Sequence, residues 1–181
     1  MKTLVVCLGN ELVGDDGVGI RVGRVLRGLS LPAGTELRIR PNLGLELIEL
    51  LGEFERVILV DAMTTGRRPG TCEIINVAEA EGMASCPTCA HSIGVPEILQ
   101  IGRKLYPDRM SGVVRIVGIE GEAMTEFGVG LTEPVRRGMV RAVDVVLEAL
   151  GASSALRREG RAAAEAQAAR QTSMAEVLGT R

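Results

Sequence analysis

Apolar runs and amphipathic stretches alternate along the first 150 residues of the chain, and this alternation predicts an α/β fold. Two short runs, at residues 3–7 and 56–61, are apolar almost throughout, as is typical of strands buried on both faces. Residues 35–40 alternate polar and apolar side chains, which indicates a strand at or near a sheet edge. Further strands are expected at residues 70–77 and 112–119. The connection before residues 70–77 is too short for a helix, so this strand is a candidate for antiparallel pairing.

Four helices are expected between these strands, because apolar side chains recur there at helical spacing. They lie near residues 18–29, 45–51, 93–105 and 135–150. Ser92 is a candidate N-cap of the third helix, and Thr132 caps the fourth, with Pro134 in its first turn. The predicted fold is a three-layer α/β sandwich, in which a mostly parallel, twisted sheet carries helices on both faces.

Composition divides the chain at about residue 151. Residues 1–151 are expected to form a single α/β domain. Residues 152–181 are rich in Ala, Arg, Glu and Gln and predict a weakly amphipathic helix or a disordered tail without a catalytic role. Residues 78–91 are expected to form a loop.

Charge and composition argue against some classes of partner and indicate a cellular compartment. The net charge is −2 and the chain holds one Tyr, two Phe and no Trp, so it offers neither a basic face nor a stacking platform for nucleic acid. No apolar run has the length of a membrane span, and the N-terminus enters a strand without a signal-peptide pattern. We therefore expect a cytoplasmic protein without structural disulfides among its four cysteines.

The most informative stretch is the glycine-rich turn at residues 8–19, which joins the first strand to the first helix. It carries Asp15 and Asp16 in succession. Two carboxylates repel a phosphate, and they favour a cation or share a proton. The turn therefore predicts an acidic, metal-facing site at the carboxyl end of the sheet. A purely structural role in a turn or helix cap is the alternative, and it fits Asp15 better than Asp16.

Two more residues are expected at the same edge of the sheet. Asp61 ends the strand at residues 56–61, and His91, the only histidine, lies just before a helix. A lone histidine is more often a packed or solvated residue, but two carboxylates and an imidazole are a plausible set for a transition metal with open positions. Glu120, Glu122 and Glu126 also fall near this edge, where solvated loop charge is the favoured interpretation.

Cys86 and Cys89 form a CxxC pair two residues before His91. This spacing is compatible with part of a zinc site, with a redox pair, or with a loop that holds two reduced thiols. The pair lies in a Pro-containing loop, which weakens the redox interpretation, and the remaining alternatives stay open.

At this point the sequence resembles the [NiFe]-hydrogenase maturation endopeptidases over roughly residues 1–150. The matching segments are Leu8-Gly9-Asn10, Asp15-Asp16-Gly17-Val18-Gly19, Val60-Asp61-Ala62, His91-Ser92-Ile93-Gly94, Val117-Gly118-Ile119 and Gly128-Val129-Gly130-Leu131-Thr132. The resemblance implies that Asp16, Asp61 and His91 are the metal-contacting residues. Cys7, where a glycine is common, the CxxC pair and the tail depart from the family pattern.

The resemblance also implies an activity. Such an enzyme removes a C-terminal peptide from the hydrogenase large-subunit precursor after nickel insertion. The nickel belongs to the substrate, and a further metal at Cys86 and Cys89 stays open. We expect a monomer. Either the metal or a carboxylate activates water in this mechanism. The sequence has no nucleophile elbow, and Cys89 and His91 are too close for a catalytic dyad.

Two other functional classes remain open from the sequence. The first is a nucleotide- or cofactor-binding module, which the missing G-x-G-x-x-G pattern and the doubled aspartate disfavour. The second is a nickel-binding accessory or checkpoint protein without peptidase activity, which needs the same ligands.

Overall fold

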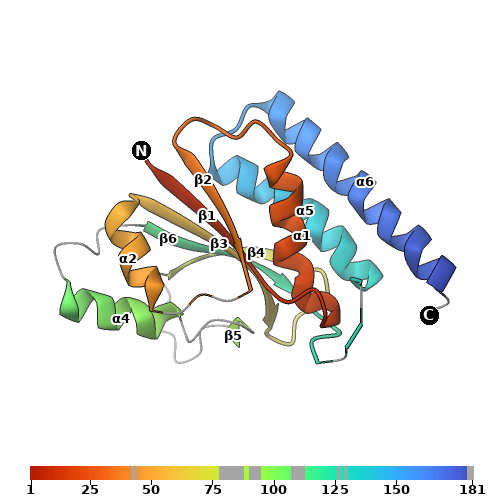
Figure 1. The fold of residues 1–181 in the computed structure, drawn as a ribbon, viewed down its shortest axis with the longest axis horizontal. Helices are drawn as coiled ribbons and strands as arrows, with labels where there is room; N and C mark the ends of the chain where they lie inside the picture. The colour runs from red at the N-terminus through yellow and green to blue at the C-terminus, as the bar shows by residue number, and fades with distance from the viewer. Residues whose placement is uncertain are drawn as a thin grey trace.

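A computed structural model describes most of the chain, namely residues 1–41, 43, 45–77, 88–89, 95–106, 113–125, 127–128 and 130–178. A twisted sheet runs through its centre in the order β2-β1-β3-β6-β4, and β5 pairs with the end of β3 off this path (Figure 1). The strands are β1 (Thr3–Leu8), β2 (Thr35–Arg40), β3 (Arg56–Thr64), β4 (Cys72–Asn76), β5 (Thr88–Cys89) and β6 (Val113–Glu120).

The strand directions follow the sequence-based expectation. β2, β1, β3 and β6 are parallel to one another, while β4 at the opposite edge is antiparallel to β6. Two expectations were wrong in detail. β3 continues past Asp61 to Thr64, so Asp61 lies inside the strand and does not end it. Within the stretch expected to be a loop, β5 pairs antiparallel with β3 through Cys89 and Met63.

Helices cover both faces of the sheet, which confirms the three-layer α/β sandwich. They are α1 (Val18–Arg27), α2 (Glu46–Glu53), α4 (Val95–Leu105), α5 (Glu133–Ala149) and α6 (Ser154–Leu178). In Figure 1, α1, α5 and α6 lie on one side of the sheet, and α2 and α4 lie on the other. None of the helices in the described ranges is both long and apolar enough to cross a membrane.

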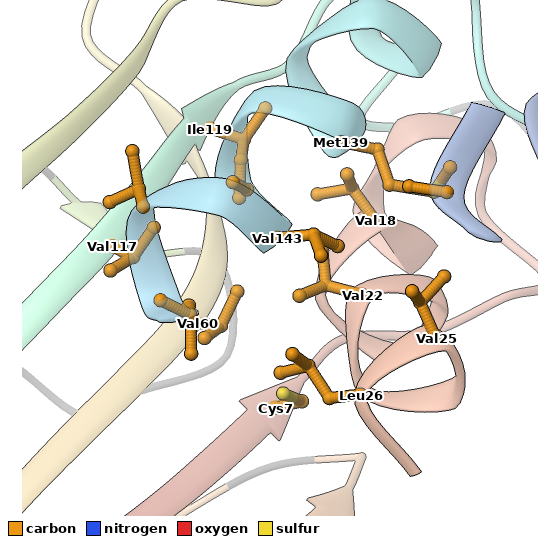
Figure 2. Packing of buried hydrophobic residues seen from close by; sticks show 14 of the residues in the cluster. Cys7, Val18, Val22, Val25, Leu26, Val60, Val117, Ile119, Met139 and Val143 are labelled. Carbon is orange, nitrogen blue, oxygen red and sulfur yellow. The ribbon is translucent and has the colours of Figure 1, made fainter. Parts of the chain in front are cut away.

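The larger core lies between the sheet and helices α1 and α5 (Figure 2). Apolar side chains of α1, such as Val22 and Leu26, meet Val143 of α5 over β1 and β3. The helix can approach this closely because Gly19 has no side chain. A Cβ there would lie 2.2 Å from the carbonyl oxygen of Leu8 and 2.6 Å from that of Val60. This contact fixes the start of α1 over the carboxyl ends of two neighbouring strands.

The opposite face holds a smaller core, in which Leu47 and Phe54 pack with Leu4, Val6 and Leu59 of the sheet. An open groove of about 800 Å³ lies between α2 and α4. Its apolar lining comes from Leu45, Ile48, Ile101, Leu105 and Tyr106. The two faces are therefore covered unequally.

The C-terminal stretch is helical from Ser154 to Leu178 and packs along α1 and α5. Ala164 is fully buried, and Gln167 Nε2 donates a hydrogen bond of 3.0 Å to the carbonyl oxygen of Arg21. Buried Asp144 of α5 accepts hydrogen bonds from Arg157 and Arg161 of α6. These contacts explain how a weakly amphipathic helix is held on the folded body.

Candidate active site

The turn between β1 and α1 is held in one shape by its own backbone. Gly9 has a φ of +137°, and a Cβ there would lie 2.1 Å from the carbonyl oxygen of Asp16, so only glycine fits. The amide of Asn10 donates to Asp16 Oδ2 at 3.2 Å, and Asn10 Oδ1 accepts from the amide of Leu12 at 3.1 Å. A short 3₁₀ helix, η1 (Gly14–Gly17), then carries both aspartates below the surface. These contacts within the turn orient the Asp16 carboxylate.

Asp15 ties this turn to the loop between β6 and α5. Its Oδ2 accepts hydrogen bonds from the amides of Glu122 and Ala123, at 3.0 and 2.9 Å, and from the Thr132 hydroxyl at 3.0 Å. Its Oδ1 accepts from the amide of Thr132 at 2.6 Å. Asp15 is thus structural, but it caps no helix, since the N-cap of α1 is Gly17. The Thr132 hydroxyl binds Asp15 and makes no capping bond to α5, although Thr132 is the N-cap residue.

Asp61 lies in very different surroundings near the end of β3. Its side chain is 1% exposed, and Oδ1 accepts a hydrogen bond of 2.9 Å from the amide of Ala62. Its Oδ2 is buried and has no hydrogen-bond partner within the described part of the chain. Burial raises the pKa of Asp61 to about 7, and the negative charge of Asp16 adds to this effect while the Ala62 amide opposes it.

The structure brings Asp16 and Asp61 to the same edge of the sheet. Val60 pairs with Cys7 near the end of β1, and the start of α1 lies over both strands. Both carboxyl groups are buried, and their charges influence each other. Two acidic groups are thereby held next to each other in a site shielded from water.

The third predicted ligand, His91, lies outside the described residues, as does Cys86. Cys89 belongs to β5, where its backbone pairs with Met63 two residues beyond Asp61. Over the ranges that the structure describes, no three His, Cys, Asp or Glu side chains form a group that could hold a metal ion.

The two remaining cysteines lie in strands. Cys7 is buried in β1, and Cys72 is half-buried at the start of β4. Burial raises the pKa of Cys7 far above its ordinary value and that of Cys72 to about 11, which keeps both thiols protonated at neutral pH.

Sequence reasoning missed the role of Glu120. It was expected to be a solvated loop charge, but it is the buried last residue of β6. Glu120 Oε1 accepts hydrogen bonds from the amides of Thr65, Gly66 and Arg67, and Oε2 accepts from the Thr65 hydroxyl. Glu120 therefore fixes the turn that follows β3. The sequence feature that could have indicated this buried role is that Glu120 directly continues an apolar strand. Glu122 is exposed, and Glu126 lies outside the described residues.

A family model described as "Hydrogenase maturation protease" matches residues 42–149, which is more than half of the chain. The chain belongs to the hydrogenase maturation protease family. The matched residues include Asp61 and His91, whereas the turn with Asp15 and Asp16 precedes them and α6 follows them.

Individual members of the family agree with this assignment. The hydrogenase 2 maturation protease of Escherichia coli is 28% identical over 152 residues, which cover 83% of this chain and 91% of the relative. The hydrogenase expression/formation protein HupD of Rhizobium leguminosarum bv. viciae is 27% identical over 168 residues, which cover 89% and 81%. The solved structure of the hydrogenase maturating endopeptidase HybD from E. coli superimposes with a TM-score of 0.72 at 27% identity, covering 83% of this chain and 93% of that one.

Membership in this family makes the chain a hydrolase of the protease class. It also decides against the nucleotide-binding alternative. That alternative requires a phosphate-binding turn after β1, and this turn carries two buried aspartates instead.

Proposed function

We propose that this protease removes a C-terminal peptide from the large-subunit precursor of a [NiFe] hydrogenase after nickel insertion. Asp16, Asp61 and His91 contact the nickel that the precursor carries. The observation that carries this proposal is the state of Asp61, a buried carboxyl beside a second acid, with one oxygen that has no hydrogen-bond partner within the described residues.

The electrostatics of the acidic pair explain why a metal-loaded precursor is the preferred substrate. Two adjacent buried carboxylates repel each other, and burial already raises the pKa of Asp61 to about 7. A divalent cation between them removes this repulsion and supplies the missing partner of Oδ2. The nickel-free precursor brings no such cation, so it binds more weakly, and cleavage follows metal insertion.

Chain connectivity supports including His91. Cys89 is paired with Met63, two residues after Asp61 on β3. His91 follows Cys89 by two residues, and two residues of extended chain span at most about 7 Å. This short separation along the chain supports counting His91 with the two aspartates. Imidazole nitrogen with carboxylate oxygen is a ligand set that suits nickel.

Hydrolysis then requires an activated water molecule. A carboxylate of the acidic pair is a candidate general base that accepts a proton from this water. The water oxygen adds to the scissile carbonyl carbon, the C–N bond breaks, and the proton passes to the leaving amine. Activation of the water by the substrate's nickel is the alternative route.

The test is processing of nickel-loaded and nickel-free precursors by the purified protein, followed by intact mass. We expect loss of the C-terminal peptide from the nickel-loaded form alone. Binding of the loaded precursor without cleavage would instead indicate an assembly checkpoint.

Substitutions in the same assay test the three residues. Asp16→Asn, Asp61→Asn and His91→Ala should each lower the processing rate by at least about 100-fold, since general acid–base groups contribute on this scale. Glu11→Gln is the matched control, because Glu11 is an acid of the same turn that is already paired with Arg24. Normal processing by two of the three variants would show that the assignment is wrong.

A further inference from the structure

We infer that Leu12 and Phe127 form an apolar ledge beside the acidic pair, and that this ledge binds an apolar segment of the hydrogenase precursor. The inference rests on the proposed function, since it names the surface on which that substrate docks.

Both side chains are unusually exposed for their type. Leu12 is 62% exposed and Phe127 is 88% exposed. The chain has only two phenylalanines, and the other, Phe54, is buried in the core. Neither Leu12 nor Phe127 belongs to the two hydrophobic cores, so the described fold gains little from their apolar surface. Exposed apolar groups of this size gain free energy when a partner covers them.

The two residues are presented by backbones that are bonded to each other. The amide of Gly128 donates to the carbonyl oxygen of Leu12 at 3.1 Å, and the amide of Gly14 donates to that of Gly128 at 3.0 Å. Val13 and Gly128 form an isolated parallel bridge. The turn after β1 and the loop after β6 are therefore joined beside the two side chains. A surface held in this way loses little conformational entropy when it binds.

The Asp15 carboxylate adds further hydrogen bonds between the turn after β1 and the loop after β6. It accepts from the amides of Glu122 and Ala123 in the loop, while its own amide donates to the carbonyl oxygen of Ala123 at 3.0 Å. The ledge and Asp16 thus belong to one hydrogen-bonded unit. Leu12 precedes Asp16 by four residues, which span at most about 14 Å. A precursor segment that extends a few residues from a nickel ion at Asp16 can therefore reach the ledge.

The charge around the ledge favours an apolar segment over a charged one. Glu11, the neighbour of Leu12, is paired with Arg24 and lies 3.8 Å from Arg21. Its negative charge is thereby compensated, so it does not select a basic partner. The exposed apolar surface of Leu12 and Phe127 is then the feature that a partner covers, and it suits aliphatic or aromatic side chains of the precursor near its nickel-binding segment.

The test measures both the dissociation constant and the Michaelis constant for a panel of nickel-loaded large-subunit precursors. Leu12→Ala and Phe127→Ala should each raise both constants about tenfold, as truncation of a contact buried on binding does. The rate at saturating precursor should stay close to that of the wild type, because the ledge holds no reacting group. Leu12→Met and Phe127→Tyr, which keep the apolar surface, should restore binding.

Leu105→Ala is the matched control, since Leu105 is also 62% exposed but lies on α4, on the opposite face of the sheet. Unchanged constants for both alanine variants, with an active wild type, would overturn the ledge alone. A wild type that binds but does not cut would refute the protease proposal and still test the ledge through the dissociation constant. A wild type that binds no precursor, or a ledge that mediates only self-association, would overturn the inference.

Discussion

Asp15 and Asp61 are both buried at the carboxyl edge of the sheet, yet their surroundings are opposite. Asp15 accepts four hydrogen bonds from the loop after β6 and from Thr132, so each of its oxygens has a donor. Asp61 accepts one hydrogen bond from the amide of Ala62, and its second oxygen has no partner within the described residues. The pKa of Asp61 is accordingly raised to about 7 by burial and by Asp16.

This contrast separates a structural carboxylate from one that is available to a ligand. A buried carboxylate that is fully hydrogen-bonded contributes to folding, whereas one with an unused oxygen is costly until a proton or a cation reaches it. The same residue type therefore serves two purposes at one edge of the sheet. The number of donors that the fold directs at each carboxylate decides which purpose it serves.

The largest loss of stability is expected from Asp15→Ala. This substitution leaves three part-buried amides and one hydroxyl without their acceptor, which should lower the free energy of unfolding by about 3 kcal/mol. Urea denaturation measures this loss. Asp15→Asn keeps one acceptor oxygen and should lose about half as much. A change below about 1 kcal/mol for Asp15→Ala would remove the contrast with Asp61.

The pH dependence of stability should reveal the raised pKa of Asp61. Asp61 has a pKa of about 7 in the folded chain against an ordinary value of 3.8, so the folded state holds more protons between these pH values. Its contribution therefore makes the free energy of unfolding fall as pH rises through this window. Asp61→Asn should remove that fall and become more stable than the wild type at high pH, by up to about 4 kcal/mol.

Urea denaturation of both proteins from about pH 4 to about pH 8 tests this prediction. Hydrogen bonds from Arg157 lower the pKa of Asp144, so its stabilising contribution is lost as pH falls. Both proteins contain Asp144, and its effect cancels in their difference. A difference in stability that stays constant with pH would contradict the raised pKa of Asp61.

The smallest effect is expected from Thr132→Val. This variant loses the hydroxyl that donates to Asp15 but keeps the backbone amide that binds the other oxygen. The free energy of unfolding should fall by about 1 kcal/mol. Thr132→Ser retains the hydroxyl and serves as the control. A loss for Thr132→Ser with none for Thr132→Val would show that the methyl group, and not the hydrogen bond, stabilises the junction.

Several features of the fold could be predicted because they depend on local pattern. The buried strands β1 and β3, the edge strand β2 and the helices after them follow from apolar spacing alone. Antiparallel β4 followed from a connection too short for a helix. The acidic edge was predictable too, because parallel strands end at the same edge and both Asp16 and Asp61 lie near such ends.

Other features could not be predicted because they depend on contacts between distant segments. β5 is only two residues long and forms through pairing with the end of β3, so it has no periodicity to detect. The role of Glu120 depends on amides 53 to 55 residues away in the chain. Helix α6 has weak amphipathicity, and its position is fixed by Asp144, Gln167 and the buried Ala164.

The sequence by itself determined the fold class, the succession of strands and helices along the chain, and the place of the two acids at one edge of the sheet. It could do so because side-chain periodicity and chain direction are local properties. Only the tertiary structure decided what each carboxylate does. Asp15 and Asp16 are neighbours of the same type, and although the sequence favoured a structural role for Asp15, it did not reveal the four donors that Asp15 meets. Hydrogen bonding and burial arise when segments more than 100 residues apart fold together, and they assign Asp15 to the junction while leaving Asp61 with an unused oxygen.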